Sequence, residues 1–333
     1  MLSRCKPEGS YGRGLVNSAR LAVLLCTPLV ALLLPVYAHA LSPADILRLA
    51  VKADGHVAYT AEVEIGVYAG GHQVGVHVQR ITKAPVNRRR VESLGRKGGG
   101  VIVSNGREEW EYRNGQPEAR VRELSSPDDI LRWRLAALDA VAGTLHPVYE
   151  GQATIAKRRC HVIAVKPPDG ERTRKRVWID REKYVELKTI RYSPAGGIQA
   201  TWTVKSICYD PRISSSVFEF RPPEGTRVRR IPRAPRMNLS SAEQRVGFDA
   251  VVPDYLPDGY VLLREQVGVL PGPGGGGLWL QFTDGVDSFS LFQNRGGGPP
   301  PPRGGHGVTS WQARGRSFVL VGPVSREDAE RIK

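Results

Sequence analysis

The stretch RTRKRVWIDREKYVELKTIRYSPAGGIQATWTVKSICY, residues 172–209, predicts the architecture of the first and longer part of the chain. Within it Ala200, Trp202 and Val204 alternate with polar residues, which is the period-two pattern of a strand with one dry face. The turn-forming runs DREK at 180–183 and SPAGG at 193–197 divide the stretch into three strands. We therefore expect a curved antiparallel meander.

Alternating segments upstream extend this sheet. Residues 62–67 and 74–78 both alternate, and Gly70-Gly71 between them predicts a hairpin. Val74, Val76 and Val78 share one face of the second of these strands. Further strands are expected at 88–94, 100–104, 108–112, 151–155 and 160–165, with Asn105-Gly106 as a hairpin turn.

Two helices begin with the same device, a serine cap followed by proline and an acidic first turn. These starts are Ser42-Pro43-Ala44-Asp45 and Ser126-Pro127-Asp128-Asp129. Apolar stripes follow each of them, Ile46, Leu49 and Ala50 in the first and Leu131, Leu135 and Leu138 in the second. Helices that arrive singly among antiparallel strands pack on one face of the sheet, so the fold class is α+β.

Residues 1–40 have the composition of a secretory signal peptide. A basic start precedes the apolar run 21–36, and Ala38-His39-Ala40 offers a cleavage site, so the mature protein is expected to begin at Leu41. The alternative is an uncleaved membrane anchor. Pro28, Pro35 and the short run disfavour it, so we expect a periplasmic or otherwise extracytoplasmic location.

The chain is strongly basic. Its formal net charge is +15, and removing the leader takes away four basic residues and one acidic residue, which leaves +12. An exported basic protein favours anionic partners such as phospholipid head groups, lipopolysaccharide or an acidic protein surface. Export argues against nucleic acid. The other interpretation is that the charge serves solubility alone.

Composition divides the mature chain into two domains. Residues 41–228 are expected to form the first, and residues 248–333 a smaller α+β domain. Between them, 229–247 is predicted to be an extended linker, because RVRRIPRAPR at 227–236 is rich in arginine and proline. The inserts 271–277 and 296–307 are so rich in glycine and proline that mobile loops are expected there.

No pattern in the chain predicts catalysis, a metal or a cofactor. The sequence lacks H-E-x-x-H, G-x-S-x-G and a phosphate loop, and its histidines show no metal-ligand spacing beyond the pair His72 and His77. A hydrolase whose triad assembles only in space is the remaining enzymatic hypothesis. Cys160 and Cys208 lie on separate predicted strands, either joined in a disulfide or as two buried thiols.

Aromatic residues recur along the predicted strands, and ordinary core packing accounts for any single one of them. The functional interpretation is that a curved sheet covered by helices encloses an apolar hollow for an acyl chain, with arginines meeting a phosphate or carboxylate at its mouth. The candidate ligand-binding residues are then Trp110, Tyr112, Trp178, Trp202, Arg88 and Arg90.

These features resemble a known family. The motif VWID at 177–180 and the closing FEFRPPEG at 218–225 resemble the half-barrels that include the lipoprotein carrier LolA and the periplasmic sigma-E regulators RseB and MucB. The segment VPDYLPDGY at 252–260 is similar to the second domain of those regulators. The resemblance covers nearly all of the mature chain and implies an unclosed antiparallel half-barrel with helices on its concave side.

The resemblance also implies a role. Regulators of this family bind the extracytoplasmic part of a membrane-anchored anti-sigma factor and shield it from proteolysis, and lipid or lipopolysaccharide fragments relieve that shielding. Candidate partner contacts in the second domain are Tyr255, Leu256 and Tyr260. The alternative is a periplasmic carrier of lipid or lipoprotein. The oligomeric state stays open.

Overall fold

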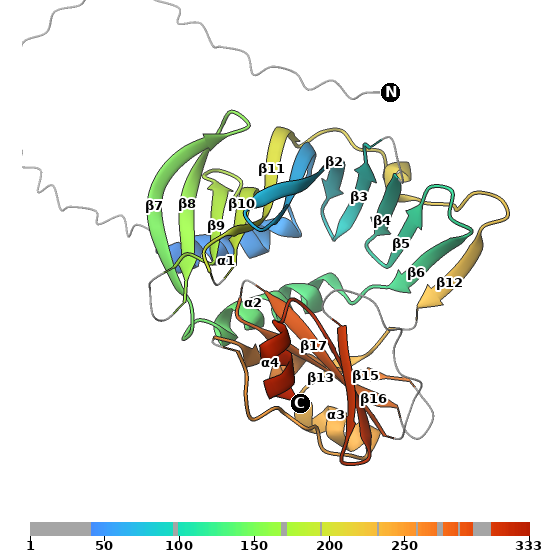
Figure 1. Cartoon of the computed structure of the whole chain (residues 1–333). Coiled ribbons are helices and arrows are strands. Elements are labelled where there is room, and N and C mark those ends of the chain that lie inside the picture. The colour runs from blue at the N-terminus through green and yellow to red at the C-terminus, as the bar shows by residue number, and fades with distance from the viewer. Residues whose placement is uncertain are drawn as a thin grey trace, which may run out of the picture.

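Two β-sheets, one large and one small, make up most of the molecule (Figure 1). A computed structural model describes residues 41–95, 99–167, 172–193, 195–231, 233–257, 259–271, 276–285, 287–295 and 308–333. The predicted signal peptide, residues 1–40, lies outside the described residues. So do residues 272–275 of the first glycine- and proline-rich insert and the whole of the second, 296–307.

The large sheet has twelve strands and consists of two antiparallel meanders joined side by side. The first meander is β1 Tyr59–Ala69, β2 His72–Ala84, β3 Arg88–Ser93, β4 Gly100–Asn105, β5 Glu108–Arg113 and β6 Glu118–Glu123. The second is β7 His146–Ile155, β8 Arg158–Lys166, β9 Lys175–Asp180, β10 Glu186–Tyr192 and β11 Ile198–Tyr209. Residues 172–209 thus form three paired strands, as predicted.

A seam between β1 and β11 joins the two meanders. Tyr59 pairs with Tyr209 at one end of the seam and Val67 with Ala200 at the other. A further strand, β12 Arg227–Ile231, adds in parallel to β6. The sheet then ends at β12 on one side and at β7 on the other, without closing. The predicted unclosed half-barrel is confirmed.

Helix α1, Pro43–Asp54, covers one face of the large sheet, which we call the inner face. The Ser42 side chain accepts a hydrogen bond from the Asp45 N–H (3.1 Å), and the Asp45 carboxylate accepts one from the Ser42 N–H (3.2 Å). Ile46 is 2 % exposed and packs with Ile163, Val177 and Ile179. The predicted cap therefore starts the helix that closes the inner face.

Helix α2, Pro127–Ala140, lies between the large sheet and the second domain (Figure 1). Its start is also as predicted, with the Ser126 hydroxyl accepting from the Asp129 N–H at 3.1 Å. Despite its apolar stripe, α2 buries none of its residues fully. Its contacts are therefore spread over two partners, and it is packed tightly against neither.

The opposite, outer face of the sheet is partly bare. Val74 is 63 % exposed and Val76 is 51 % exposed, because the register pairs Val76 with Gly66 and Val78 with Glu64. That register places the β2 valines on the same side as the glutamates of β1, away from α1. The valines share a face, as predicted, and along β2 that face stays exposed.

The small sheet has seven strands and its own core. Its strands are β13 Arg236–Met237, β14 Val261–Leu262, β15 Val267–Leu270, β16 Gly277–Thr283, β17 Ser288–Arg295, β18 Val308–Ala313 and β19 Arg316–Val321. Helices α3 Leu239–Val246 and α4 Arg326–Ile332 accompany it. Leu278, Leu280 and Phe282 are all completely buried in the core of this domain.

The predicted linker over 229–247 is wrong in its extent. Residues 229–231 belong to β12, 236–237 form β13, and α3 contributes Ala242 and Val246 to the second core. Alternation of arginine with apolar residues is typical of an edge strand as well as of a linker, so the sequence alone does not distinguish the two.

Charged and aromatic side chains hold the two domains together. Arg174, ahead of β9, lies 3.4 Å from Asp284 and 3.7 Å from Asp287, in the turn between β16 and β17. Arg191 of β10 also pairs with Asp287. Both aspartates are nearly inaccessible to solvent, so these ion pairs are desolvated. Removing one partner would leave a buried, unpaired charge and lower the stability of the protein.

A second contact joins α2 to the small sheet. Gln266, in the 3-10 helix η2 Arg264–Gln266, donates from Nε2 to the Trp133 carbonyl oxygen at 2.8 Å. The Arg236 guanidinium lies over the Trp133 ring at 5.2 Å and the Trp279 ring at 4.6 Å. Trp133 thus anchors helix α2 to the second domain.

Candidate functional site: an apolar cavity beneath the half-barrel

The inner face of the large sheet encloses a cavity of about 540 Å³ between α1 and α2. This volume lies within the range of roughly 300–1,000 Å³ that small-molecule pockets occupy. Its apolar lining comes from both helices, the segment after α2 and the sheet: Leu47, Val51, Leu138, Val141, Ala142, Leu145, Val165, Val177, Val185 and Trp202.

The cavity exists because α2 bridges the inner face without filling it. Leu138 in the last turn of α2 and Val141 and Leu145 in the segment after it line the cavity. The sequence predicted the Leu138 ridge as a packing surface for the sheet. The apolar ridge was the sequence signal that could have indicated these lining residues. Sequence reasoning did not predict that a cavity separates the ridge from the sheet.

Ion pairs line the rim of the cavity. Asp54 at the end of α1 accepts hydrogen bonds from Lys83 and from Arg134 of α2, and Arg48 donates to Asp139. Burial would raise the pKa of the Asp54 carboxyl, but Lys83 and Arg134 outweigh it and hold that pKa at about 2. The rim therefore presents cationic donors that an anionic head group would share with Asp54.

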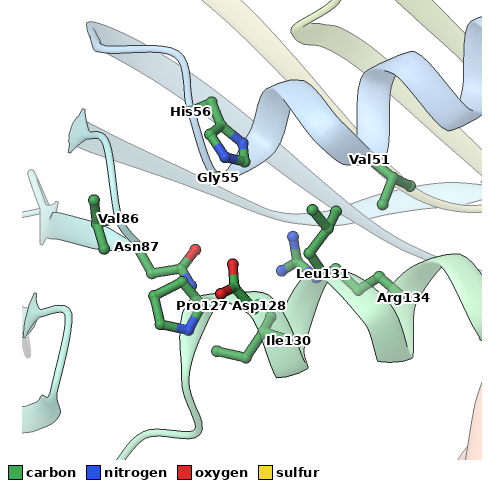
Figure 2. Close-up of a pocket in the computed structure, with 10 residues that line it drawn as sticks. All are labelled: Val51, Gly55, His56, Val86, Asn87, Pro127, Asp128, Ile130, Leu131 and Arg134. Atoms are coloured by element: carbon green, nitrogen blue, oxygen red, sulfur yellow. The ribbon is translucent and has the colours of Figure 1, made fainter.

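A smaller hollow of about 120 Å³ adjoins the cavity at the start of α2 (Figure 2). Asn87 in the β2–β3 turn, His56 after α1, and Asp128 surround it (Figure 2). Val51 and Arg134 line both spaces. The smaller hollow is below the size range of ligand pockets, and it extends the polar end of the larger one.

Of the aromatic residues proposed for ligand binding, Trp202 lines the cavity. Trp110 and Tyr112 do not reach it, because their register places them on the outer face. There both rings pack on Phe220, at 5.8 and 6.0 Å between centroids. Trp178 also points away from the cavity-lining Val177, and Lys188 Nζ lies 4.7 Å from its ring centroid.

The two proposed arginines are held on the outer face as well. The Arg88 guanidinium lies 5.4 Å from the ring of Phe218, at the end of the 3-10 helix η1 Ser215–Phe218. Arg90 donates from Nη1 to the Val217 carbonyl oxygen at 3.4 Å. The segment that follows β11 therefore covers β3–β5 by packing on these two arginines and on the rings of Trp110 and Tyr112. None of these four residues lines the 540 Å³ cavity.

Comparison with known proteins now adds to this geometry. Residues 65–216 match the family model of the MucB/RseB N-terminal domain. The first domain of this chain thus matches the MucB/RseB N-terminal domain over most of its length. This confirms the resemblance found in the sequence. Comparison with curated proteins gives no match.

Three solved MucB structures share the arrangement of both domains. MucB in complex with MucA(peri) has a TM-score of 0.52 at 16 % identity, over 87 % of this chain and 97 % of that chain. The MucA/MucB complex of Pseudomonas aeruginosa gives 0.52 at 17 %, over 87 % and 96 %. MucB alone gives 0.51 at 17 %, over 87 % and 95 %. At this identity the likeness shows a common fold.

The partner contacts proposed from the sequence lie partly inside the second domain. Tyr255 donates from its hydroxyl to Asp328 of α4 at 2.6 Å, and the Arg331 guanidinium lies 3.5 Å from its ring centroid. Leu256 packs against the core, and the Tyr260 ring lies 5.2 Å from Phe289. These residues attach the last helix and the loop to the sheet, and their contact with a partner stays a prediction.

The proposed disulfide between Cys160 and Cys208 does not form. Cys160, on β8, is a free and buried thiol. Two strands, β9 and β10, separate β8 from β11, which places the two residues about 14 Å apart by strand spacing. A disulfide needs Cα atoms within about 7 Å. Burial also raises the pKa of the Cys160 thiol to about 11, so the thiolate is scarce.

Among the described residues, no group of three or more His, Cys, Asp or Glu side chains is arranged to hold a metal ion. Across the same residues, no helix is both long and apolar enough to cross a membrane.

Proposed function

We propose that this protein is an exported, non-enzymatic regulator that binds the periplasmic part of a membrane-anchored anti-sigma factor or a similar envelope-stress partner. The observation that carries the proposal is the two-domain arrangement, which extends over 87 % of this chain and 97 % of a MucB chain solved in complex with MucA(peri). The family match of the first domain supports it. The basic charge of the chain suits an acidic partner surface.

We further propose that the cavity senses a lipid or a lipopolysaccharide fragment. Its lining is apolar along α1, α2 and the sheet, which suits an acyl chain, and Trp202 contributes the largest lining side chain. Arg48, Arg134 and Lys175 stand at its rim, where a phosphate or carboxylate would meet them. Because α2 also contacts the second domain through Trp133, an occupied cavity would affect both domains.

The partner proposal is tested by isothermal titration calorimetry. Mature protein, residues 41–333, is titrated with the periplasmic domain of the membrane-anchored anti-sigma factor encoded in the same genome. We expect saturable one-to-one binding and slower proteolysis of that domain. If neither binding nor protection occurs with any membrane-anchored partner from that envelope, the regulator role is rejected.

The lipid proposal is tested by native mass spectrometry of protein purified from its own envelope fraction. A lipid-sized adduct is expected, and Trp202→Ala should weaken its retention by about tenfold through lost apolar contact in the cavity. The matched control is Trp110→Ala, which removes an aromatic ring from the outer face. An adduct that both variants retain equally would place the lipid elsewhere.

The second candidate function, a carrier of lipid or lipoprotein, is favoured by the same cavity. A carrier must deliver its ligand to an acceptor membrane, whereas a sensor need only bind it. Incubating the loaded protein with acceptor vesicles and following the lipid distinguishes the two. Transfer to the vesicles without binding of any anti-sigma factor would favour the carrier.

A further inference from the structure

The large sheet leaves a regular edge at β12, on the side away from β7 (Figure 1). β12 pairs in parallel with β6 over five residues, from Arg227 opposite Glu118 to Ile231 opposite Arg122, with no register shift. The Arg227 N–H donates to the Pro117 carbonyl oxygen at 2.8 Å. In a parallel pair alternate residues bond the neighbouring strand, so Val228 and Arg230 direct their N–H and C=O groups outward.

The opposite edge of the same sheet is protected. β7 contains Pro147, and its register with β8 shifts between Tyr149 and Gly151. Proline and bulges are the devices by which sheets prevent addition of another strand. β12 has neither in its five residues, all of which are exposed. One edge is therefore blocked, and the other is open for pairing.

Charge along the open edge is positive and incompletely neutralised. The single carboxylate of Glu118 lies 3.0 Å from Arg227, 3.6 Å from Arg120 and 3.9 Å from Arg229. Burial works to raise the pKa of Glu118, but hydrogen bonding and attraction from these arginines hold it below its ordinary value. Three guanidinium groups thus share one carboxylate. Beside them, Arg89 and Arg122 share Glu109.

We propose that β12 is a docking edge for an acidic, extended peptide segment of a partner protein, which adds to the large sheet as a further strand. The outward N–H and C=O groups of Val228 and Arg230 supply the backbone ladder. Arg230 pairs with Glu108 at 3.1 Å, whereas Arg227 and Arg229 share Glu118 and can select acidic side chains. Val228 and Ile231, 42 % and 41 % exposed, offer apolar contacts. A second copy is disfavoured because arginine would face arginine. The inference does not depend on the proposed function.

The first test uses a fluorescein-labelled peptide of alternating Glu and Val, about nine residues long to span the edge. Fluorescence anisotropy with residues 41–333 should show binding that weakens at least tenfold when Lys replaces Glu in the peptide. N-methylation of alternate peptide backbone nitrogens should weaken it equally. No binding of the acidic peptide, or equal binding of the three peptides, overturns the proposal.

Hydrogen exchange distinguishes strand addition from simple charge attraction. The amides of Val228 and Arg230 should exchange at least tenfold more slowly when the acidic peptide is bound. The amide of Arg229 already bonds β6 and should change little. Binding without protection at Val228 and Arg230 contradicts the docking edge.

Variants test the same surface. Val228→Pro removes an outward donor and leaves the bonds to β6 in place, because proline is tolerated where the N–H faces solvent. This variant should bind the acidic peptide about tenfold more weakly than the unmodified protein does. Arg227→Glu combined with Arg229→Glu should do the same by reversing charge, even if Val228→Pro fails to fold.

Arg245→Glu, exposed on α3 of the second domain, is the control and should bind as the unmodified protein does. Equal binding by all variants rejects the edge.

Discussion

The two domains bury their apolar residues in different ways. In the second domain, Phe282 and Phe289 stack 4.7 Å apart at the centre of one continuous cluster, at 0 and 1 % exposure. In the first, apolar residues divide between separate clusters, and a cavity of about 540 Å³ remains under α2. A filled core makes a domain rigid, whereas unfilled apolar space is available to a ligand. The first domain is therefore the one with apolar space for the proposed ligand.

The largest expected effect comes from opening the filled core. Phe282→Ala should lower the free energy of unfolding of the second domain by about 4 kcal/mol, since truncating a buried aromatic ring loses its transfer free energy and leaves a cavity. Leu138→Ala at the wall of the existing cavity should cost about 1 kcal/mol, because that side chain already faces empty space. Urea denaturation measures both. Equal losses would remove the distinction between the domains.

A smaller effect is expected at the junction of the two domains. Gly285, at φ +79°, lies so close to the segment after α2 that an added Cβ would meet Leu145 Cδ1 at 2.2 Å and Val141 Cγ2 at 2.8 Å. Gly285→Ala should therefore separate the domains and cost about 2 kcal/mol beyond its backbone strain.

The matched control for the junction is Gly315→Ala. Gly315 has a similar φ of +71°, but an added Cβ there meets nothing within 4 Å. The two variants share backbone strain and differ in the contact. Small-angle scattering should show a larger radius of gyration for Gly285→Ala alone. An unchanged radius would mean that the ion pairs of Arg174 and Arg191 hold the domains without this contact.

Much of the first domain was predictable from sequence, because it depends on local signals. The Ser42 and Ser126 caps, the Gly70-Gly71 hairpin and the strands of 172–209 each rest on neighbouring residues, and the structure has them as expected. Alternation also predicts which residues share a face. It does not predict which face is covered, since that depends on where α1 packs.

This limit explains the placement of the candidate site. Trp110 and Trp202 both alternate with polar residues on predicted strands, yet Phe220 covers the first and the cavity receives the second. The covering segment comes from 217–220, and its docking on β3–β5 is a long-range contact without a local signal. Helix α2 was predicted correctly, whereas its contact with the second domain at Trp133 is a long-range contact without a local signal.

A still smaller effect is expected from the ion pairs at the cavity rim. Asp54→Asn should lower the free energy of unfolding by about 1 kcal/mol at pH 7, a discounted value because the Asp54 side chain is 41 % exposed. The pKa of Asp54 is lowered from 3.8 to about 2, so its contribution is complete above pH 4 and disappears as pH falls through 2.

Urea denaturation between pH 7 and pH 2 checks this dependence. The unmodified protein and Asp54→Asn should converge at the acidic end. The control Asp254→Asn, exposed in the second domain, should stay parallel to the unmodified protein. A constant difference for Asp54→Asn at every pH would show that the amide disturbs packing and that the charge contributes little.

The smallest effect is expected on the bare outer face. Val76→Thr should change the free energy of unfolding by less than about 0.5 kcal/mol, because Val76 is 51 % exposed. The same change at Val63, which is fully buried on the neighbouring strand, should cost about 2 kcal/mol by burying a hydroxyl. Thermal unfolding of the pair measures the difference. A loss of about 2 kcal/mol for Val76→Thr as well would contradict the exposure of that face.

The seam between β1 and β11 has a consequence for how the chain folds as it is made. Tyr59 pairs with Tyr209, so β1 is synthesised about 150 residues before its second neighbour. Closing so long a loop is slow, and during that delay one edge of β1 stays open to other chains. Glu62 and Glu64 lie on this strand, where acidic residues oppose aggregation. Their alternation with valines thus protects the nascent chain as well as setting one face of the finished sheet.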